Sequence, residues 1–424
     1  MLEEILDIRN VEKAFRQVAA NKGAAGIDDM RWSELRDWLN NNWQTLRKDI
    51  LEGNYKPQAV RKVEIPKPGG GVRMLGIPTV TDRMLQQAMA QWMTPKWEPE
   101  FSKYSYGFRE GRNAHQAVMQ AQSNLNEGYA WIIELDLEKF FDRVNHDKLM
   151  GLLAKKITDK RTLKWLRSYL NSGIMEGGVV SPRSEGTPQG SPLSPLLSNI
   201  VLNELDRELE ARGHRFVRYA DDCSIYVKSE KSARRVKEAI TEYIEGKLKL
   251  KVNRDKSRVS HPGESTLLGF SFYPGEKGWE IRIAPKSLKR IREKMREKTK
   301  RNDPSGAKEK IKKMEAVIRG WVNYFAIARA KSKMQGLDEM IRTRLRMGTW
   351  KQWKKPRTKR RNLEKLGINH QKAYEWSNSR KGYCRVAHSP VLCRALSNEH
   401  FTRLGYIGFA NYYYWKTEHQ KRLF

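Results

Sequence analysis

The sequence predicts an α+β protein in which a small antiparallel sheet is followed by a helical bundle and a small basic C-terminal module. Short strand-like runs occur in the first two thirds of the chain. After about residue 285 the strand signals fade, while apolar residues continue to recur at helical spacing, and most of the positive charge lies there too. With 424 residues and 39% hydrophobic content, the chain is long enough for about two to four domains with buried cores.

The first part of the chain is predicted to be a helical extension over residues 1–50, because it contains few breakers apart from a turn at 21–30. Residues 61–78, RKVEIPKPGGGVRMLGIP, alternate around a glycine turn as a β-hairpin does. Residues 82–93 return to helical spacing. This segment therefore supplies one hairpin between helices.

Two further strand-like segments follow. WIIELDLEKFF (131–141) resembles a strand leading into a helix, and FVRYADDCSIYV (216–227) resembles two short strands joined by a turn. Between them, 184–209 is a Gly/Pro-rich loop that enters a helix, because proline is tolerated in a first turn. One face of this helix is predicted to be apolar, with Leu196, Leu197, Ile200, Val201 and Leu205. We expect these strands to form the small antiparallel sheet.

Acidic residues lie where the predicted strands end. Asp136 ends the first strand-like run, and Asp221 and Asp222 lie at the junction of the other two. Aspartate is also a common turn residue, so the pair alone would be weak evidence of function. A sheet can bring distant strand ends together, however, and clustered carboxylates are the oxygen ligands that magnesium prefers. Two such ions about 3.5 to 4 Å apart catalyse phosphoryl transfer in many enzymes.

The positive charge indicates a polyanionic partner. The formal net charge is +33, and residues 285–424 carry 37 Lys and Arg against 11 Asp and Glu. Trp and Tyr lie among these cations at 344–355 and 411–416, so stacking on bases is available beside phosphate pairing. The alternative is a solvated basic surface with aromatic residues in the core. We favour nucleic acid, because such an excess repels itself unless a partner screens it.

The last third is predicted to begin with three helices at 285–353. Residues 354–362, KKPRTKRRN, are basic, contain proline and lack apolar periodicity, so we expect a linker before a small terminal module.

Several other classes of protein and site are disfavoured. No run is apolar enough to span a membrane, and no leader peptide is evident. The three cysteines are an odd number in a long chain, which argues against a disulfide framework, so we expect an intracellular protein. No P-loop signature occurs. A zinc site built from Cys384, His388, Cys393 and His400 is the weaker reading, because no paired-cysteine spacing accompanies them.

Five motifs follow one another along the chain: IPKPGGGVRMLGIP (65–78), SYGFREGRNAHQA (105–117), ELDLEKFFD (134–142), GTPQGSPLSPLLSNI (186–200) and YADD (219–222). Together they resemble the ordered series of group II intron reverse transcriptases of the bacterial type. Further resemblances lie in 21–30 to the N-terminal extension, 267–272 to the primer grip and 318–325 to the maturase or thumb domain. The resemblance implies a right-hand polymerase, with fingers and palm at 51–284, a thumb/maturase domain at 285–353 and a linker with a DNA-binding module at 354–424. We expect no H-N-H endonuclease domain.

The resemblance implies a role for each acid. Asp136, Asp221 and Asp222 would be the catalytic residues and would bind two Mg²⁺ ions, with Mn²⁺ as a possible substitute. The backbone carbonyl of Leu137 would be a further metal ligand. Tyr219 would support the metal site or contact the primer, although a packed hairpin aromatic fits its position nearly as well.

The resemblance also implies a site for the incoming nucleotide. Lys67 and Arg73 would pair with the triphosphate, and an exposed basic hairpin is the alternative. Phe141 would exclude a ribose 2′-hydroxyl, although Phe140 and Phe141 are adjacent and at least one must face inward. Gln189 would contact the nucleotide where the neighbouring Gly190 lets backbone approach closely.

The implied function is RNA-directed DNA synthesis from a DNA primer with deoxynucleotides, together with a maturase role in intron splicing and retrohoming. Expected partners are the intron RNA, the RNA template/DNA primer duplex and target DNA, in the bacterial cytoplasm and away from membranes, with the oligomeric state left open. Two alternatives remain, a non-catalytic RNA-chaperone maturase and a domesticated reverse transcriptase serving defence or repair.

Overall fold

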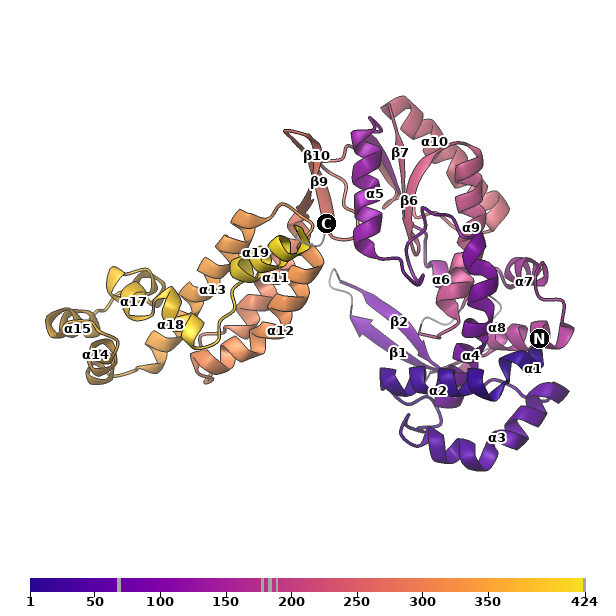
Figure 1. Ribbon diagram of the computed structural model, residues 1–424, viewed down its shortest axis with the longest axis horizontal. Helices are drawn as coiled ribbons and strands as arrows, with labels where there is room; N and C mark the ends of the chain where they lie inside the picture. The colour runs from indigo at the N-terminus through magenta and orange to yellow at the C-terminus, as the bar shows by residue number, and fades with distance from the viewer. Residues whose placement is uncertain (67–69, 177–178, 182–184, 188–189, 422–424) are drawn as a thin grey trace. The chain divides into compact units, whose positions relative to one another are not determined.

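The computed structural model describes residues 1–66, 70–176, 179–181, 185–187 and 190–421. The chain forms two compact units, Met1–Pro262 and Gly263–Phe424 (Figure 1). Among the described residues, no helix combines the length and the apolar character that crossing a membrane requires.

The central sheet of the first unit has the strand order β6-β7-β3-β8, and every neighbouring pair is antiparallel. Ile132, Ile133 and Leu135 are buried in β3, so this strand forms part of the core. Helices α5 and α9 contact β6 (Figure 1). Helix α10 contacts β3, β7 and β8. The predicted small antiparallel sheet is therefore confirmed. The strands of this sheet are β3 (Trp131–Leu135), β6 (Arg215–Tyr219), β7 (Asp222–Val227) and β8 (Arg258–Ser260), and the helices that contact it are α5 (Ala114–Asn126), α9 (Ser194–Ala211) and α10 (Glu230–Tyr243).

A second sheet has the order β2-β1-β4-β5. Strands β1 and β2 pair antiparallel with Ile65 opposite Arg73, which confirms the predicted hairpin at 61–78. Strand β4 joins β1 in parallel and β5 antiparallel. The four strands are β1 (Val60–Pro66), β2 (Val72–Ile77), β4 (Ile174–Glu176) and β5 (Val179–Ser181).

Helices complete the first unit. Helix α2 packs on α4, and Leu35, Leu39 and Leu46 are buried in α3, so the predicted N-terminal helical extension packs through an apolar face. Helix α9 buries the face that its sequence predicted. The remaining elements are α1 (Leu2–Ile5), α2 (Ile8–Asn21), α3 (Leu35–Glu52), α4 (Val80–Trp97), η1 (Glu98–Glu100), α6 (Phe140–Arg143), α7 (His146–Ala154), α8 (Lys160–Asn171) and the π-helix η2 (Ile244–Leu248).

The second unit begins with a hairpin of β9 (Phe270–Gly275) and β10 (Gly278–Ile283). Phe270 packs against Tyr324 and Phe325, with ring centroids 5.4 and 4.9 Å away. The hairpin belongs to the second unit, which begins at Gly263, whereas the resemblance placed fingers and palm at 51–284. The three predicted helices follow as α11 (Pro285–Lys298), α12 (Ala307–Phe325) and α13 (Lys331–Gln352).

The segment 354–362, expected to be a linker, instead enters a helix. Pro356 occupies the first turn, where its missing N–H costs no hydrogen bond, and the charged residues that follow are good helix formers. Leu363 is the buried residue of this helix, so apolar periodicity could not reveal it. The C-terminal helices are α14 (Pro356–Lys365), α15 (His370–Ser377), α16 (Tyr383–Ala387), α17 (Pro390–Ala395), α18 (Asn398–Arg403) and α19 (Phe409–Lys421).

Candidate active site

The three predicted acids lie at adjoining strand ends. Leu135, the last residue of β3, pairs with Cys223 of β7, and Asp222 begins β7. Continuing this antiparallel register by one residue sets Asp136 opposite Asp222. Asp221 lies next to Asp222 in the turn before β7. The sheet therefore brings together acids that are far apart in sequence.

The turn that carries Asp221 is tight. Tyr219 pairs with Asp222, which leaves Ala220 and Asp221 as the two turn residues. Ala220 has a φ of 58°, in the left-handed region, as a hairpin turn of this length requires at its first position. A Cβ atom on Gly107 would lie 2.3 Å from the Ala220 nitrogen, so the main chain of Gly107 packs directly on the turn.

The electrostatics of Asp222 show that negative charge is concentrated here. Burial, followed by the neighbouring charges of Asp221, Asp136 and Glu134, raises the pKa of Asp222 to about 6. More than a third of the surface of Asp222 still reaches solvent, so protein atoms crowd this carboxyl group without sealing it off. The Asp136 carboxylate lies 4.0 Å from the Lys256 ammonium. The charges of Asp221 and Asp136 therefore raise the cost of ionising Asp222, and a bound cation would remove that cost.

The donor set suits a hard divalent cation, because all three side chains offer carboxylate oxygens. As they lie, no three His, Cys, Asp or Glu side chains among the described residues form a group that could hold a metal ion. The three carboxylates are ligands of the kind that such an ion prefers, and the bound ion would have to draw them closer together.

The main chain at Leu137, predicted to be a further metal ligand, has a defined hydrogen-bond pattern around it. Leu137 forms an isolated antiparallel bridge with Val252, and the hydrogen bonds around it join Asn253 N–H to the Asp136 oxygen and Glu138 N–H to the Lys251 oxygen. In this pattern the N–H and C=O of Leu137 face away from 251–253. They face the edge along which β7 lies, the side of Asp222.

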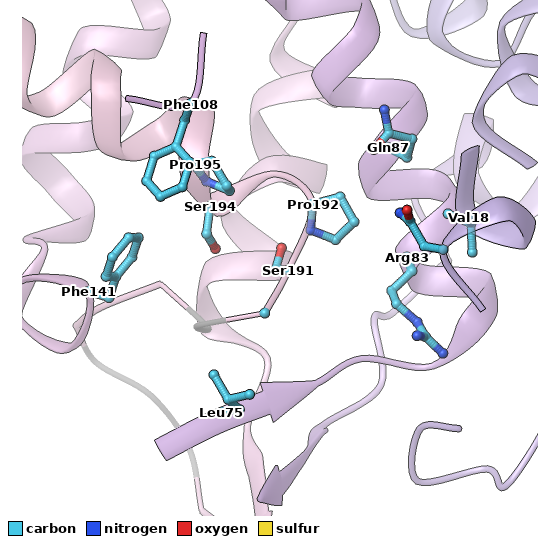
Figure 2. A pocket seen from close by; sticks show the side chains of 12 residues that line it. Val18, Leu75, Arg83, Gln87, Phe108, Phe141, Ser191, Pro192, Ser194 and Pro195 are labelled. Atoms are coloured by element: carbon cyan, nitrogen blue, oxygen red, sulfur yellow. The ribbon is translucent and has the colours of Figure 1, made fainter. Parts of the chain in front are cut away.

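A pocket of about 460 Å³ lies beside α6 (Figure 2). Phe140 is buried in the core at 2% exposure, whereas Phe141 is half-buried and lines the pocket. Their rings meet edge to face with centroids 5.2 Å apart. Of the two adjacent aromatics, Phe140 therefore faces inward. The pocket is also lined by Val18, Asn21, Leu75, Arg83, Gln87, Phe108, Gly190, Ser191, Pro192, Ser194 and Pro195.

The loop before α9 is fastened to α6 and α7. Main-chain N–H groups of Gly186 and Thr187 donate to the oxygens of Val144 and Phe141, at 2.8 and 2.6 Å. His146, buried at the start of α7, places its Nε2 atom 2.7 Å from the Gly186 oxygen. These bonds hold the loop beside Phe141.

Several predicted nucleotide-binding residues lie partly or wholly outside the described residues. Lys67 and Gln189 are both outside them, as is the side chain of Arg73, although its main chain pairs in β2. Gly190 has a φ of 111°, and a Cβ there would lie 3.0 Å from the Gly76 oxygen. The close approach of backbone expected at Gly190 is therefore present, against β2. Tyr219 is half-buried and pairs with Asp222.

Sequence reasoning missed a buried ion pair beneath the acids. Arg218 of β6 and Asp206 of α9 both have 0% side-chain exposure, and their closest N···O distance is 2.6 Å. The available signal was Arg218 itself, a cation inside the apolar run FVRYADDCSIYV. A charged residue in such a run needs a partner, but periodicity does not name the partner.

The disfavoured zinc site at Cys384, His388, Cys393 and His400 has little support in the described part of the chain. The Cys384 sulfur lies 3.9 Å from Nδ1 of His388, while Cys393 donates to the oxygen of Ala387. These cysteines and His388 are not part of any metal-binding group in the portion of the chain that is described.

Comparisons with known proteins settle the family. Residues 65–272 match the model for reverse transcriptase (RNA-dependent DNA polymerase), and 288–367 match the group II intron maturase-specific domain. Protein YkfC of Escherichia coli K12 is 35% identical over 60% of this chain and 77% of its own length. The chain belongs to the group II intron reverse transcriptases. This reverse transcriptase is thus an RNA-directed DNA polymerase with a maturase-type domain.

A second curated relative is a group II intron protein. The group II intron-encoded protein LtrA of Lactococcus lactis is 28% identical over 61% of the reverse transcriptase described here. That alignment spans 54% of LtrA, so this chain covers about half of that relative. A solved structure, the partial Cas6-RT-Cas1–Cas2 complex, aligns over 58% of this chain and 42% of its own, with 26% identity and a TM-score of 0.38.

Proposed function

We propose that Asp136, Asp221 and Asp222 hold two Mg²⁺ ions at which a DNA primer is extended on an RNA template. The observation that carries this proposal is the register of β3 and β7, which sets Asp136 opposite Asp222. Divalent cations bound there would activate the primer hydroxyl and stabilise the leaving pyrophosphate. The carbonyl of Leu137, facing the same edge, is a further candidate ligand, and Mn²⁺ is a candidate substitute for Mg²⁺.

The incoming deoxynucleotide would lie against Phe141. This ring lines the pocket beside α6, and the loop that precedes Gln189 is hydrogen-bonded to the main chain of Phe141. A rigid aromatic wall excludes a ribose 2′-hydroxyl by its bulk. Lys67, which follows β1 in the sequence, and Arg73 of β2 would pair with the triphosphate.

Primer extension tests the acids. The double variant Asp221→Asn/Asp222→Asn should lose extension on an RNA template by a factor of at least about 10³, because the site loses charge that balances the metals. Its RNA affinity should stay within about twofold, since the cationic surface is intact. The matched control is Asp147→Asn/Asp255→Asn, two exposed aspartates of the same unit. Normal extension by the first variant would refute the assignment.

We further propose that the second unit binds intron RNA and assists splicing and retrohoming in the bacterial cytoplasm. The maturase-specific match at 288–367 and the excess of cations in this region support the proposal. Tyr412 and Trp415 stack with ring centroids 5.5 Å apart, and the Arg319 guanidinium lies 5.1 Å from the Tyr412 ring. Trp415 is 50% exposed, so a base could stack on it.

Sequencing of the RNA that co-purifies with the protein tests this second proposal. An intron transcript is the expected result. A short dedicated noncoding RNA would instead indicate a reverse transcriptase that serves defence or repair. Loss of the RNA on mild protease removal of the second unit, with the first unit intact, would attribute binding to the second unit.

A further inference from the structure

The side chains of Arg218 and Asp206 meet as a planar pair beneath the turn that carries the acids. Arg218 Nε donates to Asp206 Oδ1 at 2.7 Å, and its Nη2 donates to Oδ2 at 2.6 Å. Two parallel bonds fix both the distance and the direction of the guanidinium. A lysine has the same charge but cannot reproduce this geometry.

The remaining nitrogen of Arg218 reaches the turn itself. Nη1 donates to the Ala220 oxygen at 3.0 Å and to Asn199 Oδ1 at 2.9 Å. Asn199 in turn donates from Nδ2 to the Gly107 oxygen at 2.9 Å. One guanidinium therefore joins helix α9 to the main chain at Ala220, and through Asn199 to Gly107, which packs against the same turn.

The main chain of Arg218 is held as well. Its N–H donates to the Tyr104 oxygen and its oxygen accepts from the Tyr106 N–H, both at 2.9 Å. The segment around Ser105 thus extends the edge of β6. The conformation of the turn is consequently determined from α9 on one side and from 104–107 on the other.

Stability alone does not account for this pair. Burying two charges carries a large desolvation cost, and apolar side chains of similar volume often stabilise a core as well or better. The Arg218 and Asp206 side chains carry that cost at 0% exposure. What an apolar pair could not supply is a directed bond to the Ala220 oxygen, next to the proposed metal ligands.

We propose that Arg218, oriented by Asp206 and Asn199, is a positioning residue that sets the spacing of Asp221 and Asp222 from Asp136 for metal binding. This inference rests on the function proposed above. Helix α9 begins directly after the loop residues that line the nucleotide pocket. The same contact therefore couples the position of that loop to the position of the carboxylates.

The first test uses Arg218→Lys in the full chain, with Arg212→Lys as its control. Arg212 lies at the end of α9 in an exposed ion pair with Glu208. Electron paramagnetic resonance measures the binding of Mn²⁺ to the enzyme in complex with primer and template. The affinity for Mn²⁺ should fall about tenfold in Arg218→Lys, as it does in other proteins when a residue that supports a metal ligand is removed. Extension should recover partly at high Mg²⁺, and RNA affinity should not change.

Hydrogen exchange gives a readout independent of activity. Amide exchange in 216–223 should accelerate in Arg218→Lys and stay unchanged in Arg212→Lys, because the bond to the Ala220 oxygen is lost in the first variant alone. If Arg218→Lys does not fold, Asn199→Ala replaces it. That variant keeps the ion pair and should show a smaller shift of Mn²⁺ affinity in the same direction.

The outcomes separate the two proposals. Unchanged Mn²⁺ affinity and Mg²⁺ dependence in folded Arg218→Lys, or in Asn199→Ala where the first does not fold, would overturn the positioning role while leaving the metal site standing. Extension by Asp221→Asn/Asp222→Asn would instead refute the metal site itself. Weakened Mn²⁺ binding in Arg218→Lys, with that double variant inactive and Arg212→Lys normal, supports both.

Discussion

The main-chain N–H of Thr187 donates a 2.6 Å hydrogen bond to the main-chain oxygen of Phe141. A residue of the Gly/Pro-rich loop is thereby attached to the residue whose ring lines the pocket. Gly186 reinforces the attachment, because it has a φ of 88° and a Cβ there would lie 2.8 Å from the main chain of Asp142. The wall of the pocket and the start of the loop therefore hold one another in place.

Replacing the ring of Phe141 should relax the choice of sugar. In Phe141→Ala, ribonucleotide incorporation relative to deoxynucleotide should rise on the order of 10- to 200-fold, the range that size discrimination in an apolar pocket provides. Competition of dCTP with CTP in single-nucleotide extension measures the ratio. Phe108→Ala, which removes another aromatic from the same pocket, is the control and should leave the ratio near wild type.

The protonation of Asp222 should appear in the stability of the metal-free enzyme. Its pKa is about 6 when folded and near 3.8 otherwise, so the folded form holds an extra proton between these values. The stability that this group contributes is therefore present at low pH and is lost as pH rises through about 6. In EDTA at pH 7.5, Asp222→Asn should be more stable than wild type by about 1 kcal/mol, a value reduced for solvent screening.

Thermal unfolding from pH 5 to 8 checks this prediction. The advantage of Asp222→Asn should shrink below pH 6, and added Mg²⁺ should stabilise the wild type more than the variant. Asp255→Asn, an exposed aspartate, is the control. A wild type more stable than Asp222→Asn in EDTA at pH 7.5 would contradict the assignment of clustered charge.

A methyl group at Gly107 should disturb the turn. In Gly107→Ala the new Cβ would lie 2.3 Å from the Ala220 nitrogen, so the variant should lose about 1 to 3 kcal/mol of stability, as overpacked cores do. Primer extension should fall with it. Gly151→Ala in α7 meets open space and should be neutral or slightly stabilising, and denaturant unfolding compares the two. Equal stabilities would contradict the close approach.

The stacked pair on α19 should contribute to RNA affinity. Trp415→Ala should weaken binding of single-stranded RNA by about 1 to 3 kcal/mol if a base stacks there. Trp415→Phe keeps an aromatic face and should lose less. Fluorescence anisotropy at two salt concentrations measures the affinity, and the salt dependence should be unchanged because no cation is removed. Equal affinity of Trp415→Ala and wild type would remove this surface from the proposal.

Much of the fold followed from periodicity. The strand ends with their acids, the hairpin at 61–78 and the buried face of α9 all depend on neighbours in sequence, which a pattern of alternation or helical spacing records. Asp136 and Asp222 are 86 residues apart, and placing them opposite one another requires the register between their two strands. The family resemblance indicated that these acids meet, whereas their spacing in the sequence did not.

The features that the sequence did not predict depend on contacts between elements that are far apart in the chain. The pairing of Arg218 with Asp206 joins a strand to a helix, and no local pattern distinguishes Asp206 from other helix acids. Helix α14 buries little beyond Leu363, so it looked like a linker. Asp338 of α13 receives the Tyr406 hydroxyl and the N–H groups of Phe409 and Ala410, a cap supplied from far away in sequence.

The packing of Phe270 on Tyr324 and Phe325 bears on how this polymerase could be divided into two separately expressed pieces. A cut after residue 284 would separate the β9–β10 hairpin from Tyr324 and Phe325 and would expose apolar surface on both fragments. A cut between Pro262 and Gly263 keeps the hairpin and the aromatic residues that it packs against in one fragment. Complementation assays that reassemble an enzyme from halves should therefore begin from the earlier junction.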